Sequence, residues 1–179
     1  ANGGGLAFYV DGGNNNPWDS SSTSIQWWVT DNDDGTYEYK YVLSVPTKAI
    51  SHVEIEVSPV FERVNILGID NNSRPIAANQ PAYFSGSDPS NPGMPGSMKG
   101  IKFEGGSDST TWTIQFLSDI NPMWGDFYAV DGKTPGATPA MWNVGFGTTD
   151  YVFDPTKPAQ YATSKLLVPD TGSPTVPAP

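Results

Sequence analysis

The chain of 179 residues contains no cysteine, which excludes disulfide bonds, thiol catalysis and the common cysteine-ligated metal sites. Positive charge is also scarce, because nine Lys and Arg face 19 Asp and Glu for a formal net charge of −10. Nucleic-acid binding requires clustered basic residues, so we exclude nucleic acid as a partner. No apolar run approaches the ~20 residues that cross a bilayer, so we expect no membrane span in this chain.

Helical patterning is missing as well, since no stretch of ten residues carries an apolar stripe at helical spacing. Nineteen Gly and seventeen Pro favour turns instead. Short segments with strand-like patterns recur between turn signals, at 24–30, 36–43, 51–57, 61–69, 99–104, 110–117, 124–130, 141–146 and 165–168. These segments predict an all-β fold, an antiparallel β-sandwich of jelly-roll type with about eight to ten short strands. We expect one domain over residues 1–168 and a Pro-rich tail over 169–179.

Two Asp-rich turns are the candidate metal sites. Asp31, Asp33 and Asp34 precede Gly35 in a predicted hairpin turn, and Asp11 lies in a Gly- and Asn-rich turn near the beginning of the chain. Several oxygen ligands in one turn suit calcium. The alternative is that these side chains only serve turn chemistry, because Asp and Asn are preferred there in any case.

Catalytic patterns are weak, and we predict that the chain is not an enzyme. His52 is the single histidine, no Gly-x-Ser-x-Gly elbow surrounds any serine, and the polar phase of its strand predicts a surface position for His52. Glu54 and Glu56 lie two residues apart, a spacing of ~6.5–7 Å that a glycosidase carboxylate pair could use. An exposed acidic face on an edge strand produces the same pattern without chemistry, and we prefer that interpretation.

Aromatic residues suggest a second type of ligand, because sugars stack on exposed rings. Trp27 and Trp28 are adjacent in a predicted strand and must face opposite sides of the sheet. Trp124 and Trp142 lie near predicted loops and are the candidate contacts to an extracellular polysaccharide. Burial in the core is the alternative for each of these rings.

The first strand candidate is Leu6–Val10, which follows three flexible glycines. Its residues Leu6, Phe8 and Val10 form an apolar face of a donor strand that could complete the sheet of another copy and so build a homopolymer. Pairing within its own sandwich is the equally weighted alternative. The absence of Met at position 1 is what we expect of a chain from which a signal peptide has been removed.

Four blocks resemble the exported bacterial PEP-CTERM proteins, in which an exosortase removes a C-terminal signal: K-A-I-S-H-V (48–53), P-M-W-G-D-F-Y-A-V-D-G (122–132), W-N-V-G-F (142–146) and L-L-V-P-D-T (166–171). The end, V-P-A-P, is similar to their Val-Pro-Glu-Pro signal, with Ala178 in place of Glu. The resemblance covers roughly residues 36–179. It implies a secreted protein of the cell surface or biofilm matrix, commonly without enzymatic activity.

We therefore expect an extracellular structural protein that assembles into filaments by strand exchange. The alternative is a carbohydrate-binding module in the same matrix. No cofactor is required by either interpretation, although calcium remains a candidate.

Overall fold

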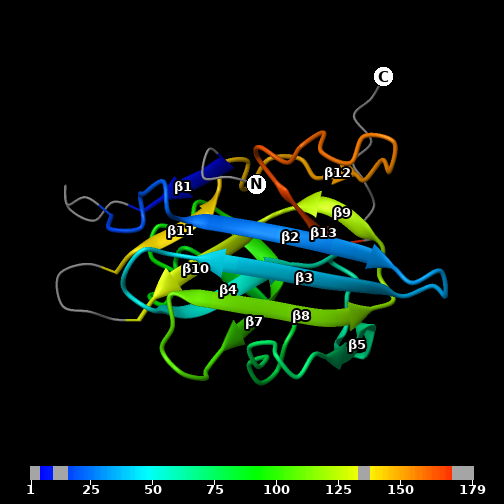
Figure 1. Cartoon of the computed structure of the whole chain (residues 1–179), viewed down its shortest axis with the longest axis horizontal. Helices are drawn as coiled ribbons and strands as arrows, with labels where there is room; N and C mark the ends of the chain where they lie inside the picture. The colour runs from blue at the N-terminus through cyan, green and yellow to red at the C-terminus, as the bar shows by residue number, and fades with distance from the viewer. Residues whose placement is uncertain (1–4, 10–15, 133–137, 171–179) are drawn as a thin grey trace.

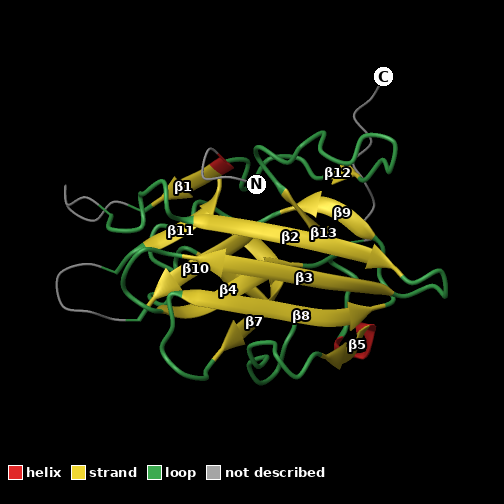
Figure 2. Cartoon of the chain, viewed as in Figure 1, coloured by secondary structure: helices red, strands yellow, loops and turns green. Residues whose placement is uncertain are grey.

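The computed structural model describes residues 5–9, 16–132 and 138–170. This part of the chain forms 13 strands with almost no helix, apart from short 3₁₀ turns such as η2 (Arg63–Asn65), so the predicted all-β fold is confirmed (Figure 2). All pairings between neighbouring strands are antiparallel. Within the described residues, no helix has the length and apolarity needed to cross a membrane.

Two sheets form the body of the sandwich, and a smaller one extends it. The four-stranded sheet has the order β2 (Ser24–Asp31), β3 (Tyr37–Ser44), β8 (Thr111–Ser118) and β5 (Ile66–Ile69). The six-stranded sheet has the order β1 (Leu6–Phe8), β11 (Ala140–Asn143), β10 (Phe127–Asp131), β4 (Ile50–Glu56), β7 (Ser97–Glu104) and β6 (Ala82–Ser85). The third sheet has the order β12 (Tyr151–Val152), β9 (Pro122–Gly125) and β13 (Leu166–Pro169) (Figure 1).

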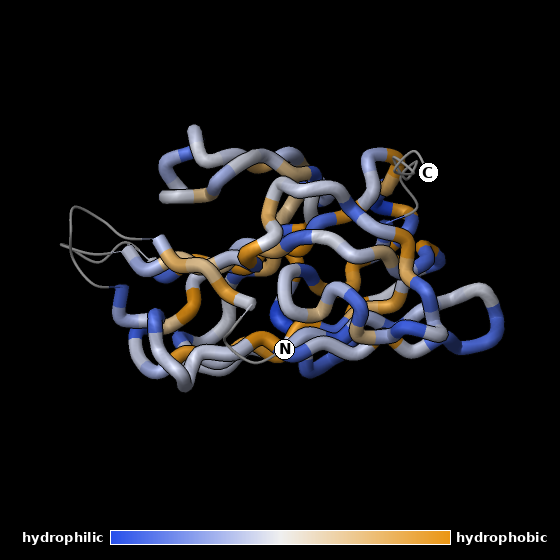
Figure 3. The backbone as a smooth tube through the Cα atoms, turned by 90° about the horizontal axis from the view of Figure 1, so that it is seen from above, coloured by the Kyte–Doolittle hydropathy of each residue, from blue (hydrophilic) through white to orange (hydrophobic). Residues whose placement is uncertain are grey.

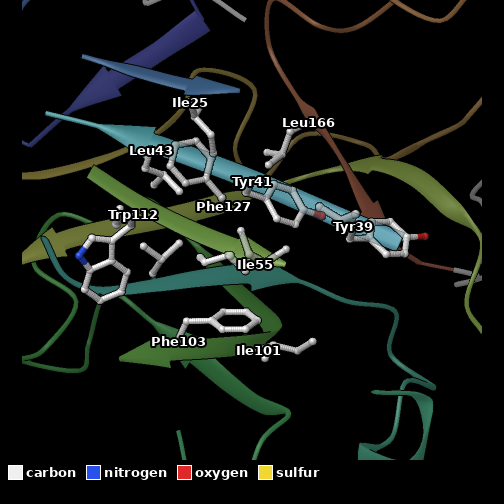
Figure 4. Close-up of a cluster of buried hydrophobic side chains, with 14 of the residues drawn as sticks. Ile25, Tyr39, Tyr41, Leu43, Ile55, Ile101, Phe103, Trp112, Phe127 and Leu166 are labelled. Carbon is white, nitrogen blue, oxygen red and sulfur yellow. The ribbon is translucent and has the colours of Figure 1, made fainter. Parts of the chain in front are cut away.

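The main core lies between the four-stranded and six-stranded sheets. Tyr39 and Tyr41, alternate residues of β3 within the predicted segment 36–43, are buried there together with Leu43. They meet side chains from the opposite sheet, including Ile55 and Phe103 (Figure 4). Burial of each large side chain contributes on the order of 2–3 kcal/mol. The phenol hydroxyls find backbone acceptors at Ile120 and Leu167, and hydrophilic segments lie mainly in peripheral loops (Figure 3).

The six-stranded sheet carries a second apolar cluster on its other face. Tyr128 and Val130 of β10 pack there with Phe84, Met94 and Phe146. Strand β4 lies between β10 and β7, so it is a central strand and both of its faces are covered. The predicted surface position of His52 and the predicted exposed edge at Glu54 are therefore wrong: His52 is 5% exposed and Glu54 is 0% exposed. Alternation between apolar and polar residues cannot reveal that a loop and a second cluster cover the polar face.

Several predicted boundaries also change. Strand β6 lies within residues 74–97, where no strand-like segment was predicted, and residues 63–65 of the predicted segment 61–69 form η2. The predicted strand 124–130 is divided at Asp126 into β9 and β10, which belong to different sheets. The loop 105–108 joins β7 of the six-stranded sheet to β8 of the four-stranded sheet. Its glycines Gly105 and Gly106 both have φ of 87°, a conformation in which a side chain is strained.

Candidate functional site

The Asp-rich turn between β2 and β3 uses its carboxylates as turn acceptors. Asp33 N donates to Asp31 Oδ1 over 2.9 Å, and Thr36 donates to Asp34 Oδ1 through both its backbone N and its hydroxyl. The hydrogen bonds from Thr36 lower the pKa of Asp34. These contacts are what the turn-chemistry alternative expects, and calcium binding at this turn stays a prediction. Asp11, the other proposed ligand, lies outside the described residues.

The predicted sugar contacts Trp124 and Trp142 have different environments. Trp124 is 1% exposed and its ring is surrounded by Trp27, Phe153 and Tyr161. It offers no free face to a sugar, so its prediction as a sugar contact is corrected: β9 lies in the middle of the three-stranded sheet and is covered on both sides. Trp142 is partly exposed and stacks on Tyr128 with ring centroids 6.3 Å apart.

The predicted donor strand forms β1, at the edge of the six-stranded sheet. Leu6 and Phe8 are half-buried against the main core, and the ladder to β11 joins three residue pairs. Val144 N donates to Gly5 O, and Tyr9 N donates to Ala140 O. The strand therefore pairs within its own chain here, as the second alternative expects. Val10 lies outside the described residues.

A group of charged side chains that the sequence interpretation did not connect lies where β9 meets β10. We call it the Lys165 cluster: Glu56 at the end of β4, Asp126 between β9 and β10, Asn143 at the end of β11, Asp150 before β12, and Lys165 before β13. Asp126 and Lys165 are buried, at 3% and 2% exposed. Five segments that are distant in sequence supply one polar site in the interior.

The hydrogen bonds of this cluster converge on Lys165 and Asp126. Lys165 Nζ lies 2.9 Å from Asp126 Oδ1 and 3.2 Å from Asp150 Oδ1, and it also donates to Thr148 O. Asn143 Nδ2 donates to Asp126 Oδ1 over 2.7 Å, and Gly147 N donates to Asp126 Oδ2 over 3.0 Å. Asp126 N in turn donates to Glu56 Oε1 over 2.9 Å. Buried ion pairs of this kind persist only when further hydrogen bonds satisfy their remaining lone pairs and protons.

Burial and crowded negative charge change the acidity of the cluster. Burial, followed by the charges of Asp126 and Asp150, raises the pKa of Glu56 to about 9. Burial also raises the pKa of Asp150 to about 6, although Lys165 opposes the rise. Burial lowers the pKa of Lys165, but Asp126 and Asp150 outweigh it and the net pKa is raised. At neutral pH the cluster therefore holds a charged Lys165 and a protonated Glu56.

Oxygens of Glu56, Asp150 and Asp170 lie within 4.8 Å of one another, the one such acidic group found in the described part of the chain. The charges of Asp150 and Asp170 are close enough to contribute to the raised pKa of Glu56. Two weak signals for the cluster are present in the sequence: Lys165 is a single basic residue before an apolar strand, and Asp126 interrupts an apolar run. Neither signal identifies its partner, because the pairing depends on how the sheets are connected.

A second cluster of polar side chains connects the loop before β7 to β4 through hydrogen bonds. His52 Nε2 lies 3.0 Å from Asn91 Oδ1 and 3.4 Å from Glu54 Oε1, and Asn91 Nδ2 donates to Glu54 Oε2 over 3.4 Å. Tyr128 donates its hydroxyl proton to the carbonyl of Pro92, in the same loop. His52, Glu54 and Asn91 are all buried, so this arrangement stabilises the loop and offers no open site for a substrate.

No family model, curated protein or solved structure matches this chain. Its function must therefore follow from the chemistry of its own residues.

Proposed function

We propose that this chain is a secreted structural protein of the cell surface or biofilm matrix, and that its copies assemble into filaments by exchanging β1. The sequence blocks that resemble exported bacterial proteins support the location. The observation that carries the assembly is the attachment of β1, a three-residue strand at the edge of the six-stranded sheet.

Removal of β1 would expose β11, a strand whose residues are mostly buried. In β11, Ala140 and Met141 are 0% exposed and Asn143 is 3% exposed, whereas all three residues of β1 remain partly exposed. An uncovered β11 would present unpaired backbone groups together with apolar side chains, and an identical β1 from a second copy fits it in the same register. Exchange of one identical element between copies requires no new interface chemistry.

Deletion of residues 1–10 tests this proposal in the full-length background. We expect a folded, soluble monomer that no longer assembles, because the chain then has no donor strand to place on β11 of another copy. Circular dichroism would establish folding, and electron microscopy with light scattering would measure assembly. Wholesale unfolding of the deletion variant, or filaments equal to those of the intact chain, would contradict the proposal.

Saccharide binding is the second candidate function, and a cavity at one end of the sandwich favours it. The cavity has a volume of about 450 Å³ and is lined by residues 48–51, 105–108, 112, 131 and 132. Trp112 is 2% exposed, and its buried indole N–H has no hydrogen-bond partner within the described part of the chain. Figure 4 shows this nitrogen on the side of the ring that faces away from the other labelled core residues.

The lining residues call for a ligand with both donors and acceptors. The ammonium group of Lys48 donates hydrogen bonds, and the carboxylates of Asp108 and Asp131 accept them. Sugar hydroxyls supply both, whereas a bare metal ion supplies no acceptor. Arg74 supports this wall of the cavity, because its guanidinium lies 4.6 Å above the ring of Trp112 and donates to the carbonyls of Gly105 and Ser107.

Titration with cellobiose, chitobiose and maltose would test this second function by nuclear magnetic resonance. The six indole N–H signals can be observed separately, and Trp112→Phe assigns the signal of interest. We expect one disaccharide to shift the Trp112 signal in a saturable manner while the signal of Trp28, 49% exposed on another strand, stays fixed. If none of the three sugars moves the Trp112 signal, water fills the cavity and this function is wrong.

A further inference from the structure

The side chains of Lys165 and Asp126 face each other with almost no access to water. They are 1% and 4% exposed, and Nζ and Oδ1 are 2.9 Å apart. An amine held against a carboxyl group in a fixed geometry gains the large rate advantage of an intramolecular reaction. The scarcity of water also disfavours the reverse hydrolysis at this position.

Hydrogen-bond donors already lie on both oxygens of Asp126. Asn143 Nδ2 donates to Oδ1 and Gly147 N donates to Oδ2, over 2.7 and 3.0 Å. Negative charge develops on these oxygens when an amine attacks the carboxyl carbon. Donors that are in place before the reaction stabilise that charge without reorganisation.

A proton acceptor for the amine is also present. Asp150 Oδ1 lies 3.2 Å from Lys165 Nζ, at the limit of direct proton transfer. Burial raises the pKa of Asp150 to about 6, which suits a group that must take up a proton and return it near neutral pH. Asp126 and Asp150 raise the pKa of Lys165, so a base within reach is needed to release its amine as a nucleophile.

We propose that Lys165 and Asp126 condense to form an intramolecular amide bond. The Lys165 ammonium transfers one proton to the Asp150 carboxylate, and the neutral amine attacks Cγ of Asp126 to form the Nζ–Cγ bond. One Cγ–O bond then breaks. The departing oxygen leaves as water after it receives the proton held by Asp150 and a second proton from the attacking nitrogen.

The reaction balances without an oxidant or another reactant, since one ammonium and one carboxylate become one amide and one water. The bond would connect the residue before β13 to the junction of β9 and β10. It would close a loop of the chain and so restrict the unfolded state, as a disulfide does in other extracellular proteins. This inference does not depend on exchange of β1, because the bond forms within one chain.

Intact-mass spectrometry of the full chain under denaturing conditions tests the bond. We expect the folded and purified protein to be lighter than its sequence by one water molecule. Digestion with trypsin should then yield one branched peptide that contains both Asp126 and Lys165. A chain that keeps its full sequence mass after folding and prolonged incubation at neutral pH overturns the proposal.

Lys165→Arg is the matched variant, because it keeps the positive charge but lacks the amine. It should have its full sequence mass. This variant also controls for ring closure at Asp34-Gly35 and Asp131-Gly132, which would remove one water by a different reaction. Loss of water that persists in Lys165→Arg therefore overturns the proposal as well.

Asp150→Asn tests the proton acceptor. We expect the lighter species in freshly synthesised protein to form at least about tenfold more slowly than in the unaltered chain. An unchanged rate overturns the role assigned to Asp150.

Discussion

Strands β1 and β13 are the first and last strands of the described chain, and they are held in opposite ways. All three residues of β1 are partly exposed, and a short ladder to one neighbour holds the strand at an edge. All four residues of β13 are buried, and Lys165, immediately before it, forms two ion pairs. Tyr41 also donates its hydroxyl proton to the carbonyl of Leu167. A strand can exchange between copies only where its attachment is weak, so β1 is the candidate for exchange and β13 belongs to the fixed body.

The largest expected effect comes from breaking the attachment of β13. Lys165→Met leaves Asp126 as a buried carboxylate without its cation, and we expect the free energy of unfolding to fall by about 3–5 kcal/mol. Urea denaturation followed by tryptophan fluorescence would measure it. Lys157→Met, at an exposed lysine, is the control and should change stability by less than about 0.5 kcal/mol. Equal effects from the two variants would refute the importance of the ion pairs.

A matched pair of leucines measures the difference between the two strands directly. Leu166→Ala removes a side chain that is 1% exposed and should reduce the free energy of unfolding by about 3 kcal/mol. Leu6→Ala removes a half-buried side chain against the same core, and about 1–2 kcal/mol is expected. Urea denaturation of both variants would show which substitution reduces the free energy of unfolding more. A larger loss from Leu6→Ala would mean that β1 is not the weaker strand.

The stability of the region around β13 should depend on pH, because the carboxyl groups of Glu56 and Asp150 lie near this strand. The pKa of Glu56 is about 9 in the folded chain and 4.5 without the fold, so between these values the folded state binds more protons than the unfolded state. The free energy of unfolding should therefore fall as the pH rises, by roughly 1–3 kcal/mol between pH 5 and 8. Asp150, with its pKa raised to about 6, acts in the same direction.

Glu56→Gln should flatten this pH profile and raise stability at pH 8, because an amide cannot ionise. Glu104→Gln, at an exposed glutamate, should leave the profile unchanged. Thermal denaturation of each variant between pH 5 and 8 would measure these pH profiles of stability. Parallel profiles for Glu56→Gln and the unaltered chain would contradict the raised pKa.

The smallest effect is expected at the exposed turn between β2 and β3. Asp34→Asn keeps an acceptor oxygen for Thr36, so the melting temperature should change by no more than about 2 °C. Calorimetry would test this expectation. If added calcium stabilised the unaltered chain but not Asp34→Asn, the turn would bind the ion and its interpretation as turn chemistry alone would be incomplete.

The sequence predicts those features that depend on local alternation. The spacing of Tyr37, Tyr39 and Tyr41 identifies a strand and its buried face, and Asp34-Gly35 identifies the hairpin that joins β2 to β3. Features that depend on which strands become neighbours cannot be predicted in this way. Burial of His52 and Glu54 requires a loop from residues 86–96 to cover β4, and no local pattern of β4 contains that information.

The same reasoning explains why the candidate sites were only partly predicted. The sequence identifies Asp31, Asp33 and Asp34 as a candidate site because these residues lie in one short turn. Lys165 and Asp126 are 39 residues apart and meet only because β9 and β13 pair. Trp124 is an aromatic residue of the kind that stacks on sugars, but the rings of Trp27, Phe153 and Tyr161 surround it.

The most direct test of the exchange of β1 uses the absence of cysteine from the natural chain. Ala7 in β1 and Trp142 in β11 are direct partners across the ladder, at a separation that permits a disulfide. The chains Ala7→Cys and Trp142→Cys would be mixed, allowed to assemble and oxidised, with Ala7→Cys and Asp34→Cys as the control mixture. Exchange predicts a covalent dimer of the two different chains in the first mixture well above the control. If both variants assemble but the first mixture yields no more dimer than the control, β1 stays within its own chain and the proposed assembly is wrong.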